Sequence, residues 1–145
     1  MIIDVTAIME AASAKSFKFV NSNTRINSKR VTDEELSKII TVMNKSWSTI
    51  KNKIKEYVGS LLDNWYEDDD GYLYGCNTAD KVMKFATLDV VDVYKHSNSY
   101  DIVIWYNSKS SHKDADKFFG NHSLTCNVEL TKDFKVSDID CQLEG

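Results

Sequence analysis

The sequence predicts a single α+β domain in which one long amphipathic helix packs on an antiparallel meander of about four strands. Apolar residues recur at helical spacing through residues 36–61. From about residue 87 they instead alternate with polar residues or gather in short Val- and Ile-rich runs, as in strands. The turns between these runs consist of Asn, Ser, Asp and Gly, and the chain contains no proline.

The length and composition fit one globular domain. The chain has 145 residues, of which 28% are charged and 42% are hydrophobic, a balance typical of folded proteins rather than disordered or membrane-spanning ones. We expect one domain over residues 1–145, made of an N-terminal segment (1–30), a segment with the long helix (31–65) and a sheet region (66–145). The N-terminus lacks the pattern of a secretory signal, and the three cysteines are widely spaced, so we expect a cytoplasmic protein without disulfides or membrane contact.

The N-terminal segment carries three different patterns. Apolar residues are spaced through residues 2–14 as in a short helix, and residues 15–20 alternate like a short strand. Residues 21–30 are polar and rich in Asn and Ser, which predicts a loop.

The long helix is the clearest element. Thr32 and Glu35 form a capping box, in which the Thr32 hydroxyl accepts a hydrogen bond from an otherwise unpaired backbone N–H. The apolar stripe then predicts a helix from about residue 33 to 64, with a length of about 48 Å. Because a domain of this size has a radius of gyration of about 15 Å, we expect the helix to overhang or to break near residues 44–46 or at Gly59. The stripe consists of Leu36, Ile40, Met43, Trp47, Ile50, Ile54, Tyr57 and Leu61.

The spacing of this stripe, alternately four and three residues, also fits a coiled coil. Ile39, Val42, Val58 and Leu62 widen the stripe on its flanks, however, and a wide apolar face suits a helix laid across a sheet. We therefore favour packing on the sheet. A structural module that forms a homo-oligomer by pairing the stripe over residues 36–61 with its copy stays open as an alternative.

The first predicted hairpin follows in the second half of the chain. Residues 88–94 and 100–106 are rich in Val, Ile and aromatic residues, and they flank the polar turn at residues 96–99. Residues 107–117 are polar and are predicted to form a loop.

The last two strands are predicted from their alternation. Residues 123–130 and 138–143 each alternate apolar and polar side chains, so each strand has one buried face. A four-residue turn at residues 131–134 places Cys126 opposite Ile139 and keeps the acidic side chains of the last strand out of the core.

An acidic run, Glu67–Asp70, follows the helix and is flanked by Trp and Tyr residues. With Gly71 at the sixth position of a calcium-binding loop, Tyr66 and Asn77 would stand where that loop requires acidic ligands, which disfavours calcium binding. Trp and Tyr are enriched at the energetic hot spots of protein interfaces. The segment is therefore a candidate interaction surface.

No other motif indicates a metal, a cofactor or a catalytic centre. His96, His112 and His122 lack the spacing of a metal pair, and the chain has no Cys-x-x-Cys pair, nucleophile elbow, Walker loop or dinucleotide-binding glycine motif. We therefore expect no metal and no cofactor. An alternative is a small α+β enzyme that uses His122, Asp101 or Asp133 as acid or base.

The net charge of −4 hides an asymmetry. Residues 1–58 contain 10 basic and 6 acidic residues, a net charge of +4, whereas residues 59–145 contain 8 and 16, a net charge of −8. The basic surplus is smaller than that of a typical sequence-independent nucleic-acid binder, so we expect no nucleic-acid partner. The acidic surplus suits docking on a basic cleft of another protein.

The end of the chain resembles a known group of proteins. Phe118-Phe-Gly-Asn-His-Ser-Leu124 leads into an alternating strand, a short turn and a last strand that runs from Val136 to Leu143-Glu-Gly145. This pattern is similar to the last hairpin of small uncharacterised bacterial α+β domains that resemble immunity proteins of polymorphic or contact-dependent toxin systems. The resemblance covers only the C-terminal third and carries over no catalytic residue. It implies a protein that acts by binding a cognate toxin.

The leading prediction is therefore a cytoplasmic immunity-type protein, not an enzyme, that binds a cognate toxin and blocks its active or substrate-binding site. A basic nuclease domain is one toxin that an acidic face would fit. The expected contact residues are the acidic run, its aromatic neighbours and two acidic residues of the second polar loop. They are Glu67, Asp68, Asp69, Asp70, Trp65, Tyr66, Tyr72, Tyr74, Asp114 and Asp116.

Overall fold

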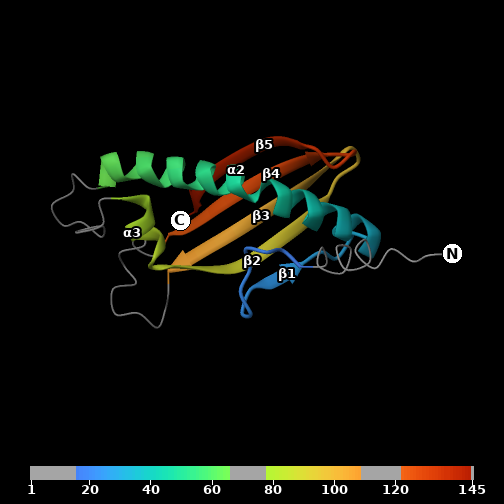
Figure 1. The fold of residues 1–145 in the computed structure, drawn as a ribbon, viewed down its shortest axis with the longest axis horizontal. Coiled ribbons are helices and arrows are strands. Elements are labelled where there is room, and N and C mark those ends of the chain that lie inside the picture. The colour runs from blue at the N-terminus through green and yellow to red at the C-terminus, as the bar shows by residue number, and fades with distance from the viewer. Residues whose placement is uncertain (1–15, 66–77, 109–121, 145) are drawn as a thin grey trace, which may run out of the picture.

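The computed structural model describes residues 16–65, 78–108 and 122–144. A five-stranded sheet in the order β1-β2-β3-β4-β5 is covered on one face by a long helix (Figure 1). The α+β class is confirmed; β2–β5 form an antiparallel meander, and β1 adds a fifth strand that is parallel to β2. The elements are β1 (Arg25–Asn27), α2 (Asp33–Trp65), α3 (Ala79–Met83), β2 (Ala86–Lys95), β3 (Ser99–Ser108), β4 (Ser123–Thr131) and β5 (Val136–Glu144).

The N-terminal part differs from its prediction. The loop predicted for residues 21–30 is wrong in its middle, because Arg25–Asn27 pairs with Val90–Asp92 at the edge of β2. All three residues of β1 are exposed, so no apolar alternation marks the strand, and it forms because the edge of β2 offers it backbone partners. The helical pattern of residues 2–14 lies outside the described residues.

Residues 16–20 form turns rather than the predicted strand. Phe17 is buried in the core, and the ring of Phe19 stacks on Trp47 of α2 with the ring centroids 4.2 Å apart. The side chain of Asn44 exchanges two hydrogen bonds with the backbone of the same segment. The two aromatic residues whose alternation suggests a strand therefore pack in the core and against α2 instead.

α2 is one continuous helix. The predicted capping box is present, because Glu35 N donates to Thr32 Oγ1 at 3.1 Å and Thr32 N donates to Glu35 Oε1 at 3.0 Å. The breaks considered at residues 44–46 and at Gly59 do not occur; the C-terminal end of the helix instead extends past the strands (Figure 1). None of the described helices is both long enough and apolar enough to span a membrane.

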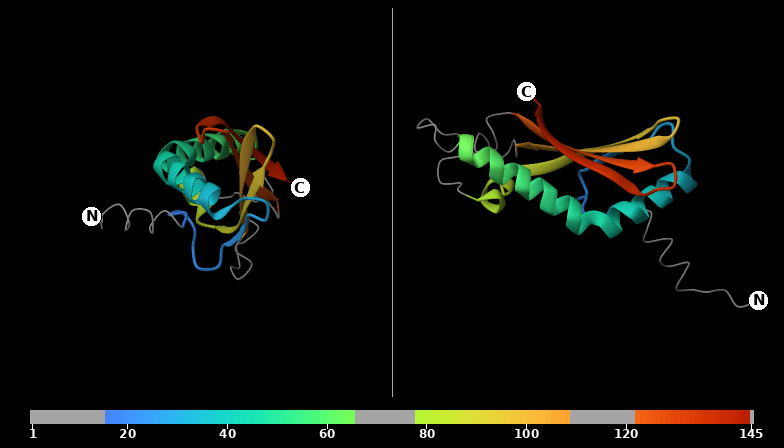
Figure 2. Two further views of the ribbon diagram at one scale, coloured as in Figure 1. Left: turned by 90° about the vertical axis from the view of Figure 1, so that its right-hand side faces the viewer. Right: turned by 90° about the horizontal axis from the view of Figure 1, so that it is seen from above.

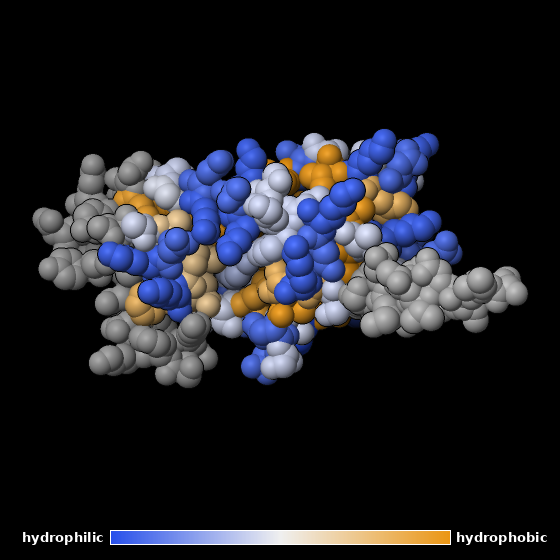
Figure 3. All heavy atoms as spheres, viewed as in Figure 1, coloured by the Kyte–Doolittle hydropathy of each residue, from blue (hydrophilic) through white to orange (hydrophobic). Residues whose placement is uncertain are grey.

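The core lies between α2 and the sheet. Alternate residues of β3 and β4 are buried, and α2 runs across that side of the sheet (Figure 2). Hydrophilic side chains predominate along the exposed side of α2 (Figure 3). The apolar stripe of α2 therefore packs against the sheet of the same chain. The fully buried residues include Ile39, Met43, Ile50, Val58, Val82, Ile102, Ile104, Leu124 and Leu130.

The β2–β3 hairpin forms as predicted, but the predicted register of the β4–β5 hairpin is wrong by two residues. Cys126 lies opposite Cys141 rather than Ile139. One residue of the shift comes from a longer turn, in which Thr131 N donates to Lys135 O at 2.8 Å, and the other from an irregularity near the end of β4. Because a shift of two keeps every side chain on its face, the predicted buried face of both strands is still confirmed.

Candidate functional site

The sequence-predicted contact residues lie almost entirely outside the described residues. Trp65 is the last residue of α2, and the others fall in segments 66–77 and 109–121. Those others are Tyr66, Glu67, Asp68, Asp69, Asp70, Tyr72, Tyr74, Asp114 and Asp116.

Within the described residues, an acidic surface lies on the sheet. The face of the sheet away from α2, which we call the open face, carries no described helix (Figure 2). Its side chains are those that alternate with the buried ones, and each of β2–β5 contributes carboxylates to it. Part of the acidic excess of residues 59–145 is therefore displayed on one surface. The carboxylates are Asp89, Asp92, Asp101, Glu129, Asp138, Asp140 and Glu144.

Asp92 and Asp89 of β2 are each held by side-chain donors of other strands. Asp92 accepts hydrogen bonds from Asn27 Nδ2 at 2.7 Å and from Trp105 Nε1 at 3.1 Å. Asp89 accepts one from Asn107 Nδ2 at 2.7 Å, and Asn107 in turn accepts one from the hydroxyl of the first residue of β4. This part of the open face already has partners for its acceptors.

The part of the open face near the two hairpin turns gathers more acceptors, of which Glu129 accepts a hydrogen bond from Ser137 Oγ at 2.8 Å and Asp140 one from Gln142 Nε2 at 3.1 Å. Glu129 lies directly between Asp101 on β3 and Asp138 on β5, and Asn127 lies opposite Asp140. The Oδ1 atoms of Asp101 and Asn127 are buried and have no hydrogen-bond partner among the described residues. We call these five residues the acceptor cluster. Neighbouring like charges lower stability, so the carboxylates of this surface are complementary to a positively charged group.

His96 lies at one end of the acceptor cluster. Its Nε2 atom lies 2.7 Å from Asp101 Oδ2, within hydrogen-bond distance. The sequence placed His96 in a turn without assigning it a role. The enzyme alternative instead combined Asp101 with His122 and Asp133, but these two lie at opposite ends of β4, so the structure does not bring the three together.

The described residues also provide no obvious metal centre. No group of three or more His, Cys, Asp or Glu side chains among them is arranged to hold a metal ion. The carboxylates of the acceptor cluster are spread along three strands rather than converging on one point.

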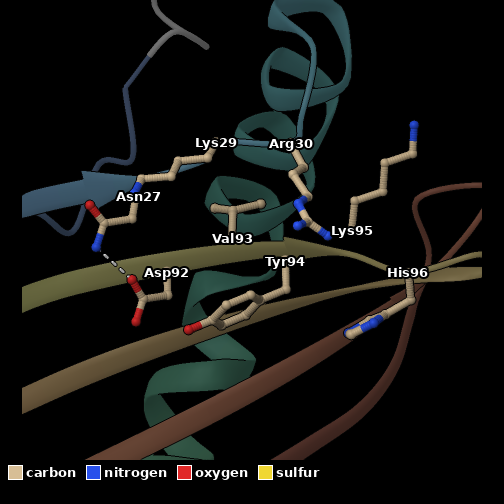
Figure 4. Close-up of a pocket in the computed structure, with 8 residues that line it drawn as sticks. All are labelled: Asn27, Lys29, Arg30, Asp92, Val93, Tyr94, Lys95 and His96. Atoms are coloured by element: carbon tan, nitrogen blue, oxygen red, sulfur yellow. Dashed lines mark hydrogen bonds between the residues drawn. The ribbon is translucent and has the colours of Figure 1, made fainter.

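A pocket of about 560 Å³ lies where β1 ends along β2 (Figure 4). β1 pairs with β2 only as far as Asp92, and Lys29 and Arg30 follow β1 along the wall of the pocket. Lys95 forms an ion pair with Glu35 at 2.9 Å. The pocket is thus a hollow of mixed charge beside the open face. Its lining residues are Asn27, Lys29, Arg30, Asp92, Val93, Tyr94, Lys95 and His96.

Glu35, near the start of α2, has partners on β2, on β3 and at the residue before the helix. It accepts hydrogen bonds from the Tyr100 hydroxyl and the Thr32 backbone and pairs with Lys95. The bond from Tyr100, followed by Lys95, lowers the pKa of Glu35 to about 2, and the same bond raises the pKa of Tyr100 to about 12. Because these bonds tie α2 to β2 and β3, we interpret the network as structural.

Comparison with protein-family models, with curated proteins and with solved structures finds no match to this chain. Its function therefore has to follow from the chemistry of its own surfaces.

Proposed function

We propose that this chain is a cytoplasmic immunity-type protein that binds a cognate bacterial toxin and blocks its active or substrate-binding site. The acceptor cluster on the open face is the observation that carries the proposal. Its carboxylates are neighbours on adjacent strands, and two of its buried oxygen atoms have no donor among the described residues. A partner that presents Lys and Arg side chains supplies the opposite charge and hydrogen-bond donors to the exposed carboxylates of β5.

The expected partner surface is a basic cleft, such as the substrate-binding cleft of a nuclease domain. Such clefts hold phosphate groups with Lys and Arg side chains, so a row of carboxylates can occupy the same donors. Arginine suits the row well, because its rigid fork of N–H donors can bond neighbouring carboxylate oxygens at once. Attraction between the two surfaces also speeds association, and this effect weakens as salt is added.

The acidic run Glu67–Asp70 belongs to the same proposal as a second contact region. Its charges have the sign of the acceptor cluster, and Trp and Tyr residues flank it in the sequence. Aromatic side chains of this kind supply apolar contact area at interfaces. The run and the acceptor cluster can be tested separately, because their residues do not overlap.

The test is co-expression and binding with a candidate toxin encoded beside this chain. Asp138→Lys combined with Asp140→Lys reverses two charges at exposed positions of β5. We expect the double variant to lose protection in cells and to bind the toxin about tenfold or more weakly, mainly through slower association at low salt. Binding rates can be measured by surface plasmon resonance at several salt concentrations.

The matched control is Glu34→Lys combined with Glu56→Lys. It makes the same change in net charge on the exposed side of α2, where these side chains are 82% and 72% exposed. We expect it to keep protection and affinity close to those of the parent chain. Equal losses for both double variants would contradict the assignment of the open face, because only the total charge would then matter.

A third variant reverses Asp68, Asp69 and Asp70 to Lys. If this variant alone loses protection, the acidic run is the contact surface and the acceptor cluster is not. Losses in both the triple variant and the Asp138/Asp140 variant would show that both regions contribute to binding.

A further inference from the structure

Two cysteines face each other across the last two strands. Cys126 of β4 lies directly opposite Cys141 of β5, and both are free thiols. Directly opposed residues of antiparallel strands hold their Cβ atoms about 4.5–5.5 Å apart, and a disulfide requires about 3.5–4.5 Å. Since β5 is at the edge of the sheet, a small local movement of this strand is enough to join the two sulfur atoms.

The two thiols differ in access. Cys126 is fully buried, whereas Cys141 is partly exposed and lines a groove of about 380 Å³ between α2 and β5. Lys53 and Tyr57 line the same groove from α2. A small molecule in solution can therefore reach Cys141 but not Cys126.

The two thiols also differ in acidity. The hydrogen bond between them raises the pKa of Cys126 and lowers the pKa of Cys141; burial and the charge of Asp140 oppose this lowering at Cys141, and the charge of Lys53 adds to it. The thiolate is the nucleophilic form of cysteine. The accessible member of the pair is thus the one that ionises more readily, and the buried member is in position to react with it afterwards.

We propose that Cys126 and Cys141 form a thiol–disulfide exchange site for low-molecular-weight disulfides. In the first step the Cys141 thiolate bonds to one sulfur of the small disulfide, whose S–S bond breaks and releases a thiolate. In the second step Cys126 passes its proton to the released thiolate and attacks Cys141 Sγ, which displaces the second small thiolate. Two protein sulfurs are thereby oxidised to one disulfide, and one small disulfide is reduced to two thiols, the second of which takes up the proton that Cys141 released to solvent on ionising.

The product disulfide lies on the helix-facing side of the sheet, behind the open face. It ties β5 to β4 and restricts the unfolded chain, so the oxidised protein should melt at a higher temperature than the reduced one. The carboxylates of the acceptor cluster keep their positions. This proposal is therefore independent of the toxin-binding proposal, and either one can fail alone.

The experiment uses the full chain with Cys76→Ser, because Cys76 is a third thiol outside the described residues. Oxidised glutathione is the probe. We expect a product that is lighter by two hydrogen atoms, a peptide map that joins Cys126 to Cys141, a raised melting temperature and full reversal by dithiothreitol. A protein that stays reduced, or that stops at a stable glutathione adduct, would overturn the proposal.

Two single variants in the same background assign the roles. With Cys126→Ala the reaction should stop at a glutathione adduct on Cys141, and with Cys141→Ala no adduct should form on Cys126. The reverse pattern would show that the roles of the two thiols are wrongly assigned. If Cys126→Ala does not fold, the peptide map of the Cys76→Ser protein still decides whether the disulfide forms.

Lys53→Gln tests the activation of Cys141 without changing either thiol. We expect it to slow the initial reaction with glutathione at neutral pH and to move the rate profile to higher pH, because the thiolate loses a nearby positive charge. Lys51→Gln, an exposed neighbour on α2, is the matched control and should leave the rate unchanged. Equal rates for the two variants would remove Lys53 from the site.

Discussion

The two faces of this sheet are built by the same strands but obey different requirements. Toward α2, β3 and β4 present Ile, Leu, Val and Cys side chains that are almost completely buried. Away from α2 the same strands present Asp, Glu, Asn and Trp side chains that are half-buried. Because side chains alternate along a strand, a position required for folding is followed directly by a position whose side chain is free for another role.

Two carboxylates show the same difference in detail. Glu35, at the start of α2, is surrounded by donors from Tyr100, Lys95 and Thr32. Asp101 Oδ1, on the open face, is buried without a donor among the described residues. The first arrangement stabilises the fold, whereas the second lowers stability and so calls for a functional reason. Toxin binding is the reason that we propose.

The largest expected effect comes from the helix-facing side. Ile104→Ala should lower the free energy of unfolding by about 2–5 kcal/mol, because the side chain is completely buried and its removal leaves a cavity. Val103→Ala, one residue away on the open face, should lower it by about 1 kcal/mol or less. Urea unfolding followed by circular dichroism measures both. Similar losses for the two variants would contradict the contrast between the faces, since the open face would then be packed as tightly as the core.

How much of the fold could be predicted from the sequence depends on the same division between buried and exposed positions. Periodic patterns report burial, so the stripe of α2 and the alternation of β4 and β5 predicted the helix bounds and the buried face correctly. β1 has no such pattern, because its residues are exposed. The register of the last hairpin depends on a turn in which Phe134 has a φ of 63°, a left-handed conformation that is uncommon for a bulky residue and that no simple turn rule selects.

Only part of the candidate site could be predicted from the sequence. The acidic excess after residue 58 indicated an acidic surface, but the row Asp101–Glu129–Asp138 depends on the pairing of three strands. Spacing along the chain does not determine the β3–β4 register, because a long segment joins these strands. The contact between His96 and Asp101 could have been predicted more readily, since the predicted hairpin turn at residues 96–99 already brings the two positions close together.

The second prediction concerns the well-partnered carboxylate, Glu35. Its pKa is lowered from 4.5 to about 2, so its contribution to stability is present above about pH 4.5 and is lost as the pH falls toward 2. Glu35→Gln keeps the capping box but removes the charge. We expect the variant to be less stable than the parent at neutral pH, and the difference to disappear near pH 2. Urea unfolding across this pH range measures the effect.

Glu34→Gln is the control for Glu35→Gln, because Glu34 lies in the same helical turn but is 82% exposed. We expect a much smaller change in stability and little dependence on pH. A pH-independent loss in Glu35→Gln would show that the network stabilises the protein through packing rather than through the carboxylate charge.

The smallest expected effect, of opposite sign, comes from Asp138→Lys on the open face. Asp138 lies directly opposite Glu129; like charges there are destabilising, and opposite charges contribute about 0.2–1 kcal/mol. We expect the free energy of unfolding, measured with urea at low ionic strength, to rise by an amount of that order, and the rise to shrink as salt screens the pair.

The control is Asp133→Lys, in the exposed β4–β5 turn, which should change the free energy of unfolding by about 0.5 kcal/mol or less. A gain in stability with a loss of toxin binding would show that Asp138 is retained for the partner. A loss of stability would mean that Asp138 already has a favourable partner within the chain, and it would remove the row of carboxylates as a docking surface.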